Sequence, residues 1–248
     1  MTVVFVHGNP ETSAIWGPLV SALNRDDVVL LTPPGFGAHL PSGFGATYRD
    51  YRDWLEVELE AIDGPIDLVG HDWGGGHVVN VVMHRPELAR SWVCDVLGIF
   101  NADFKWHGLA QEWQTPGKGE ESVQAMFDRD LAARTEQMIS LGFPDHDIAA
   151  AIAEHQNADM GRAILAVYRS ATQPAMAEAG SQLEHAGTRP GLALLPTEDS
   201  FNEAKDTRQA AVRAGARIEE LEGLGHWWMV QDPQRSADAL NRFWAGVR

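Results

Sequence analysis

The chain has 248 residues, a length that fits one large α/β domain or a core with an inserted subdomain. It carries 35 acidic and 19 basic residues, and the formal charge of −16 argues against nucleic acid and anionic membranes as partners. No apolar run reaches the length of a membrane span, and the apolar part of the N-terminus is too short for a signal peptide, so we expect a cytoplasmic protein.

Strand and helix patterns alternate along the first hundred residues. Short apolar runs rich in β-branched residues predict strands within 2–6, 27–37, 65–70 and 89–99. Apolar residues at helical spacing predict helices at 14–23, 47–62 and 74–83. The only cysteine, Cys94, lies in the fourth strand and is expected to be a buried, unreactive thiol. Strands that alternate with helices indicate a mostly parallel sheet with helices on both faces.

From about residue 100 to 186 the pattern becomes helical, with aromatic and methionine side chains spread among charged ones. The strand pattern resumes at 191–199 and 216–223, and a final helix is predicted at 233–247. We therefore expect an α/β core formed by residues 1–100 and 187–248, with residues 101–186 inserted as a helical cap. Open α/β sheets bind ligands at the carboxyl ends of their strands, so such a cap would close a pocket there.

The segment Gly70–Gly74, with the sequence GHDWG, follows the third predicted strand and precedes a helix. It fits the pattern G-x-nucleophile-x-G, in which the glycines let strand and helix approach closely and the middle residue is held in a strained conformation. That middle residue is Asp72. A carboxylate needs no deprotonation to act as a nucleophile, and its attack on a saturated carbon would leave an ester between enzyme and substrate.

Hydrolysis of that ester needs a base and donors for the oxyanion that develops. His226, near the C-terminus, is the predicted base, and Asp199, after the preceding strand, is predicted to orient its imidazole. Asp95, at the end of the fourth predicted strand, is the second choice for this acid. The backbone N–H groups of Asn9 and Trp73 are predicted to form the oxyanion hole.

The chain order nucleophile, acid, histidine is that of the α/β-hydrolase fold. The sequence resembles the aspartate-nucleophile branch of that family, which contains epoxide hydrolases and haloalkane dehalogenases. The resemblance rests on HGNP at 7–10, GHDWGG at 70–75, TED at 197–199 and GLGHW at 223–227. It covers the predicted core and implies a hydrolase. Within these motifs, His7 and His71 are expected to support the site by hydrogen bonding.

The two subfamilies differ in the group that departs. An opening epoxide forms a strongly basic alkoxide and needs a proton donor, whereas a halide needs only N–H donors. Tyr168 resembles a cap tyrosine of epoxide hydrolases, and Trp106 or Trp113 is considered as an indole N–H donor in place of a second one. Asn9 and Trp73 resemble the amide and indole pair that binds halide in dehalogenases. The sequence favours an epoxide hydrolase that forms a vicinal diol, with haloalkane dehalogenase as the alternative.

Trp106, Trp113 and Trp227 are predicted to line the substrate pocket, which indicates an apolar or aromatic small molecule. No metal motif, phosphate loop or dinucleotide fingerprint occurs, so we expect no metal and no cofactor, with water as the co-reactant. A homodimer is compatible with the sequence. Since fold alone does not fix function, a non-catalytic protein that binds small molecules is a third hypothesis.

Overall fold

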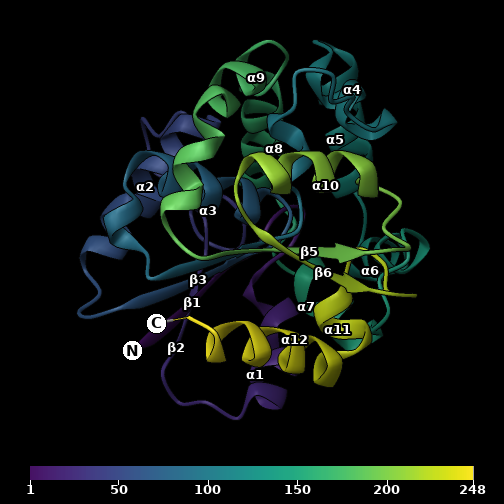
Figure 1. Ribbon diagram of the computed structural model, residues 1–248. Helices are drawn as coiled ribbons and strands as arrows, with labels where there is room; N and C mark the ends of the chain where they lie inside the picture. Colours follow the sequence, from purple (N-terminus) through teal and green to yellow (C-terminus); the bar gives the residue numbers. More distant parts are fainter. Residues whose placement is uncertain (248) are drawn as a thin grey trace.

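The structure, a computed structural model, describes residues 1–247. Six strands form one sheet in the order β2-β1-β3-β4-β5-β6, and every neighbouring pair runs parallel. The strands are β1 (Thr2–Val6), β2 (Val28–Leu31), β3 (Ile66–Gly70), β4 (Ser91–Cys94), β5 (Gly191–Pro196) and β6 (Arg217–Leu221). This sheet, with helices on both of its faces, confirms the predicted α/β class (Figure 1).

Both faces of the sheet are buried, as the side chains of β1 show. Val3 and Phe5 belong to one apolar layer, whereas Val4 and Val6 belong to the other. This alternation is the two-residue period of an extended chain. The first layer is covered by α1 (Gly17–Leu23), α11 (Trp228–Gln231) and α12 (Pro233–Ala245), and the second by α2 (Tyr48–Glu60), α3 (Trp73–His84) and α10 (Ala204–Arg213).

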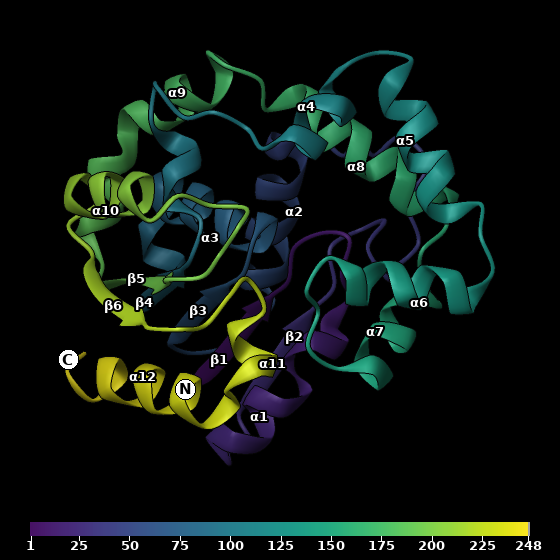
Figure 2. The same cartoon turned by 90° about the vertical axis from the view of Figure 1, so that its right-hand side faces the viewer.

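Six α-helices lie between β4 and β5 in the chain. They are α4 (Gly108–Gln114), α5 (Lys118–Phe127), α6 (Leu131–Ser140), α7 (His146–Ala153), α8 (Ala158–Ser170) and α9 (Ala175–Ala179). Three of them begin where an Asp or Asn side chain accepts a backbone N–H: Asp130 for α6, Asp145 for α7 and Asn157 for α8. The helices α4 to α8 form an arc beside the carboxyl ends of the strands (Figure 2).

The structure differs from the sequence prediction at the fourth strand, which was expected within 89–99. β4 ends at Cys94, which is buried, and a 3-10 helix forms at Leu97–Phe100. The last residue pair between β4 and β5 joins Cys94 and Ala193, and the side chain of the next residue, Asp95, bonds to His71, Asp72 and Trp228. The helix α10 was not predicted, because its sequence AKDTRQAAVR has too few apolar residues to produce a helical pattern. Among residues 1–247, no helix combines the length and apolar character needed to cross a bilayer.

Candidate active site

The nucleophile candidate lies on the sharp turn between β3 and α3. Asp72 has φ 51° and ψ −129°, a conformation that non-glycine residues rarely adopt. Two glycines allow the turn to sit this close to β1. A Cβ atom at Gly74 would overlap the carbonyl of Val6, and one at Gly8 would overlap the Asp72 carboxylate itself. The glycines therefore hold the carboxylate against the loop that follows β1.

Oxygen Oδ1 of Asp72 is held by Asn9. The backbone N–H of Asn9 donates to it over 3.0 Å, and the side-chain Nδ2 over 3.3 Å. Trp73 is the first residue of α3, so its backbone N–H has no acceptor within the helix and lies at the positive end of the helix dipole. Of the two backbone groups predicted as an oxyanion hole, that of Asn9 thus contacts the carboxylate, and that of Trp73 follows Asp72 directly in the chain. Oδ2 is left as the oxygen free to attack.

The pKa of the Asp72 carboxyl is raised toward neutral pH. Burial raises the pKa of this carboxyl from 3.8 to about 6, and the charge of Glu11 acts in the same direction. The imidazoles of His226 and His71 and the hydrogen bond from Asn9 limit the rise in pKa. Most molecules therefore carry an ionised Asp72 at pH 7. A desolvated carboxylate of this kind is a stronger nucleophile than one in water.

The structure brings His226 between the two predicted carboxylates. Its Nδ1 lies 3.0 Å from Oδ2 of Asp199, and its Nε2 lies 3.9 Å from Oδ2 of Asp72. Burial alone would raise the pKa of Asp199, but His226 and the N–H donors of Phe201 and Asn202 lower it below its usual range. An ionised Asp199 only accepts hydrogen bonds, so Nδ1 of His226 carries a proton. Burial would lower the pKa of His226, but the charges of Asp199 and Asp72 raise it. The charge of Asp72 is lost when the ester forms, which favours an unprotonated Nε2 that can take a proton from water.

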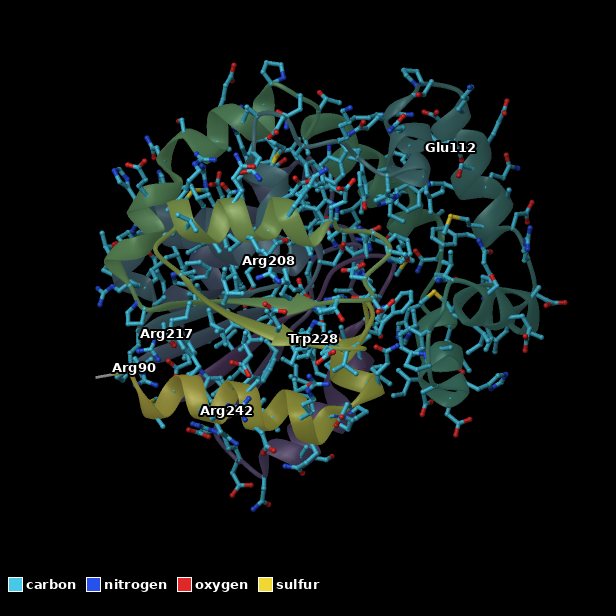
Figure 3. The ribbon with its side chains drawn as sticks, turned by 45° about the vertical axis from the view of Figure 1, so that its right-hand side comes forward. Arg90, Glu112, Arg208, Arg217, Trp228 and Arg242 are labelled. Atoms are coloured by element: carbon cyan, nitrogen blue, oxygen red, sulfur yellow. The ribbon has the colours of Figure 1, made fainter. Side chains whose placement is uncertain are left out.

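The structure does not support Asp95 as an alternative acid for His226, because its carboxylate is committed elsewhere. Oδ2 of Asp95 lies 2.5 Å from Nδ1 of His71 and accepts from the indole of Trp228 at 2.7 Å. Oδ1 accepts from the backbone N–H of Asp72 at 3.0 Å. Asp95 therefore stabilises the backbone of the turn that carries Asp72. Trp228 reaches it from α11, next to the sheet (Figure 3).

Glu11 is a buried residue of this site that the sequence analysis missed. Its Oε1 lies 3.1 Å from Nε2 of His71 and accepts from the indole of Trp227 at 2.5 Å. Burial would lower the pKa of His71, but the two carboxylates of Glu11 and Asp95 raise it well above the usual value. His71 is therefore an imidazolium between two carboxylates, a supporting role of the kind expected for it. The available signal was a glutamate directly after the HGNP motif.

Glu11, His71 and His226 each place one potential ligand atom within 4.8 Å of the others. The donor set fits a metal poorly. Both nitrogens of His71 face carboxylates and its pKa favours the protonated ring, which has no lone pair to offer. His7, in the same loop, bonds through Nδ1 to the carbonyl of Gly8, as expected from the sequence.

Tyr168, on α8, brings its hydroxyl close to Asn9, which also bonds to the nucleophile. The phenol oxygen lies 3.4 Å from Nδ2 of Asn9. Burial raises the pKa of the Tyr168 hydroxyl, and hydrogen bonds from Asn9 and from the Trp73 indole oppose that rise. The phenol oxygen accepts from Nδ2 of Asn9, so its own proton can be donated to another atom. Tyr168 thus offers an O–H donor in the cavities that it borders together with Asp72.

Asp72 lies where two cavities meet. The first is lined by the aromatic side chains of Trp73, Trp106 and Phe104, and the second by Trp113, Met126 and Trp227. The residues that border both cavities are Asp72, His107, Tyr168 and Phe201. All three tryptophans that the sequence placed in the pocket thus line one cavity or the other. His107 and Phe201 were not predicted, because neither belongs to a motif.

The indole N–H groups of Trp106, Trp113 and Trp227 differ in whether they already have a hydrogen-bond acceptor. That of Trp106 donates to the carbonyl of Ala171, and that of Trp227 donates to Glu11. Trp106 therefore does not supply the donor that the sequence analysis considered for it. Within residues 1–247, the indole nitrogen of Trp113 is buried without an acceptor. The aromatic rings pack closely. The ring centroid of Tyr168 lies 4.9 to 5.4 Å from those of Trp73, Trp106 and Trp113.

Comparison with known proteins places this geometry in context. A family model described as alpha/beta hydrolase family matches residues 3–239. A protein of Shewanella oneidensis named cis-3-alkyl-4-alkyloxetan-2-one decarboxylase is 35% identical over 106 residues, which are 40% of this chain and 33% of that protein. A haloalkane dehalogenase of Mesorhizobium japonicum is 29% identical over 143 residues, 49% of this chain and 42% of that protein. The matches span between a third and a half of these curated relatives.

Solved structures share the fold over nearly the whole chain. The haloalkane dehalogenase DbeA from Bradyrhizobium elkani has a TM-score of 0.75 at 20% identity, covering 98% of this chain and 91% of its own. E-2-(acetamidomethylene)succinate hydrolase has a TM-score of 0.70 at 20% identity, covering 99% of this chain and 91% of its own. At these identities the likeness concerns the fold, and the chemistry has to be argued from the residues themselves.

Proposed function

This chain is a member of the alpha/beta hydrolase family, and we propose that it hydrolyses haloalkanes through a covalent ester on Asp72. The observation that carries the proposal is the position of Asn9. Its backbone and side-chain N–H groups both reach Asp72 Oδ1, so one residue supplies a donor for the oxyanion and another close to the departing atom. The names of the haloalkane dehalogenase relatives support the same substrate class.

The reaction has two steps. In the first, Oδ2 of Asp72 forms a bond to the carbon that bears the halogen, and the halide leaves with the electron pair of the broken bond. In the second, water attacks the ester carbonyl while Nε2 of His226 takes its proton and Asp199 stabilises the imidazolium. The backbone donors of Asn9 and Trp73 stabilise the oxyanion. Collapse of the intermediate breaks the bond to the alkyl oxygen, which takes the proton from His226 and leaves as the alcohol, and the Asp72 carboxyl then loses its proton to water.

Epoxide opening is the second candidate, because the hydroxyl of Tyr168 lies beside Asn9 in the cavities that border Asp72. In that reaction the phenol would protonate the alkoxide as the ring opens, and hydrolysis of the ester would release a vicinal diol. The sequence alone favoured this reaction. We rank the haloalkane first because a halide needs only the hydrogen bonds that Asn9, Trp73 and the Tyr168 hydroxyl can donate, and the comparisons support that class better.

The test is to incubate the protein separately with 1-bromobutane and styrene oxide, and to measure free bromide and diol. We expect bromide release, and no release from the Asp72→Asn variant. Diol formation without bromide would reverse the ranking. Neither product, together with no mass increase on the His226→Gln variant after exposure to either compound, would favour the non-catalytic binding protein.

A further inference from the structure

His107 is a titratable side chain at the active site that takes no part in the reaction described above. It precedes α4 and borders both of the cavities that meet at Asp72. Three aromatic rings stand edge-on to its imidazole: Phe201 at 5.4 Å, Trp113 at 6.4 Å and Tyr168 at 6.4 Å between ring centroids. These rings restrict the orientation of the imidazole in the wall of the cavities.

The first turn of α4 fixes the position of the proton on this imidazole. The backbone N–H of Ala110 donates to Nδ1 of His107 over 3.3 Å. Because a backbone N–H only donates, Nδ1 must be the unprotonated nitrogen, and the neutral ring then carries its hydrogen on Nε2. Burial lowers the pKa of His107 to about 4, and the nearby His226 acts in the same direction, against the charge of Asp199. The ring is therefore neutral at pH 7.

Nε2 of His107 forms no hydrogen bond to the residues that the structure describes, and its side chain is partly exposed. The ring that carries it lines both cavities at Asp72 and also an open cavity beside Lys105 and Asp199. Among the described residues, the indole N–H of Trp113 in the second cavity also lacks an acceptor, so the test has to assign the effect to His107 itself. A neutral donor of fixed orientation can recognise an uncharged oxygen, and it gains nothing from a saturated carbon at the same place.

We propose that His107 binds an oxygen acceptor of the substrate, through Nε2–H, at a position close to the carbon that Asp72 attacks. The substrate class that follows is a haloalkane with an ether, hydroxyl or carbonyl oxygen near the reacting carbon. This inference rests on the proposed function for the identity of the departing group. The recognition of the oxygen itself does not depend on turnover.

The test compares pairs of bromides in which one CH₂ is replaced by an ether oxygen. We would measure kcat/KM for 1-bromo-2-methoxyethane against 1-bromobutane, and for 1-bromo-3-methoxypropane against 1-bromopentane. In the His107→Phe variant, which keeps a ring without the N–H, the ether-to-alkane ratio of at least one pair should fall about tenfold, as for the loss of one neutral hydrogen bond. An unchanged ratio in both pairs would overturn the proposal.

Two further variants keep the result interpretable. His107→Asn retains an acceptor that can cap α4 but is too short to reach the same point, so its ratio should fall as well. If only His107→Phe lowers the ratio, the loss of the cap is responsible and the proposal is wrong. Glu112→Ala, on the outward side of α4, is the matched control and should keep the wild-type ratio (Figure 3).

Binding distinguishes a failure of this inference from a failure of the proposed function. The Asp72→Asn variant has no nucleophile, so tryptophan fluorescence can follow the binding of the same four bromides without reaction. Preferential binding of an ether, lost on the additional substitution His107→Phe, supports the His107 assignment even if no bromide is ever released. Equal binding of ether and alkane in both pairs would contradict it.

Discussion

The phenol oxygen of Tyr168 lies 3.4 Å from the side-chain nitrogen of Asn9, although 159 residues separate them in the chain. Asn9 belongs to the loop after β1, and Tyr168 belongs to α8 in the inserted helices. The same Asn9 nitrogen reaches Asp72. Nucleophile, amide and phenol therefore meet at one point, where the departing atom would lie.

The Tyr168→Phe variant should separate the two candidate reactions. A halide loses only one hydrogen bond in this variant, so we expect kcat/KM for 1-bromobutane to fall by about tenfold. An epoxide loses its proton donor, and its hydrolysis should fall by at least about a hundredfold. Bromide release and diol formation measure the two effects. Equal losses for both substrates would show that Tyr168 acts through packing alone.

The His226→Gln variant should accumulate the ester. Attack by Asp72 does not need the imidazole, whereas hydrolysis does, so we expect one equivalent of bromide per active site followed by very slow turnover. Mass spectrometry of a digest should place an added alkyl group on the peptide that contains Asp72. General base catalysis of this kind contributes about 10² to 10⁴ in rate. Full turnover without an adduct would contradict the covalent route.

The first step should depend on pH through Asp72. The attacking group is the carboxylate, whose pKa is raised to about 6, so the rate of the bromide burst should rise with pH and level off above about 7. The charge of His226 lowers this pKa. The pH at which the burst rate is half of its maximum should therefore be higher in the His226→Gln variant. Rapid-quench measurements between pH 5 and 8, with both proteins, test the direction.

The nucleophile should also cost stability at neutral pH. A carboxyl whose pKa is raised on folding stabilises the protein at acid pH, and this contribution is lost as the pH rises through about 6. Asp72→Asn should therefore raise the free energy of unfolding at pH 7.5 by about 1–2 kcal/mol, with little effect at pH 4. Thermal unfolding at both values is the measurement. Asp103→Asn, at an exposed position, should change neither.

Removal of the buried His71 imidazolium should lower the free energy of unfolding. His71→Gln leaves the carboxylates of Glu11 and Asp95 without a positive partner, so we expect a loss of about 3–5 kcal/mol in unfolding free energy. Arg242, on the outer face of α12, forms an exposed ion pair with Glu219 of β6 and serves as the control (Figure 3). Arg242→Gln should cost less than about 1 kcal/mol. Urea unfolding of both variants measures the difference.

The fold and the three main catalytic candidates, Asp72, Asp199 and His226, could be predicted from the sequence because they depend on local patterns. β-branched runs marked the strands, and a parallel sheet places the residues after β3 and β5 at one edge. Asp72 and Asp199 could be placed there without coordinates. His226 followed from its motif near the C-terminus.

The rest depends on contacts between distant segments, which no local pattern encodes. Glu11 gains its importance from His71 and Trp227, which lie 60 and 216 residues away. His107 gains its importance from the cavities that it borders and from Phe201. The choice of leaving group was hard for the same reason, because it depends on where the Tyr168 hydroxyl comes to rest relative to Asn9.

The groups that would make and cleave the ester all lie on the loops of the sheet, whereas the phenol and the imidazole that face the departing atom and its neighbours lie on or beside inserted helices. The loops of the sheet thus encode bond-making and, through Asn9 and Trp73, part of the binding of the departing atom, whereas the inserted helices encode the rest of substrate choice. A graft of a different helical insertion between β4 and β5 would change what reacts and leave how it reacts untouched. Evolution could diversify such an enzyme by rewriting a single internal segment.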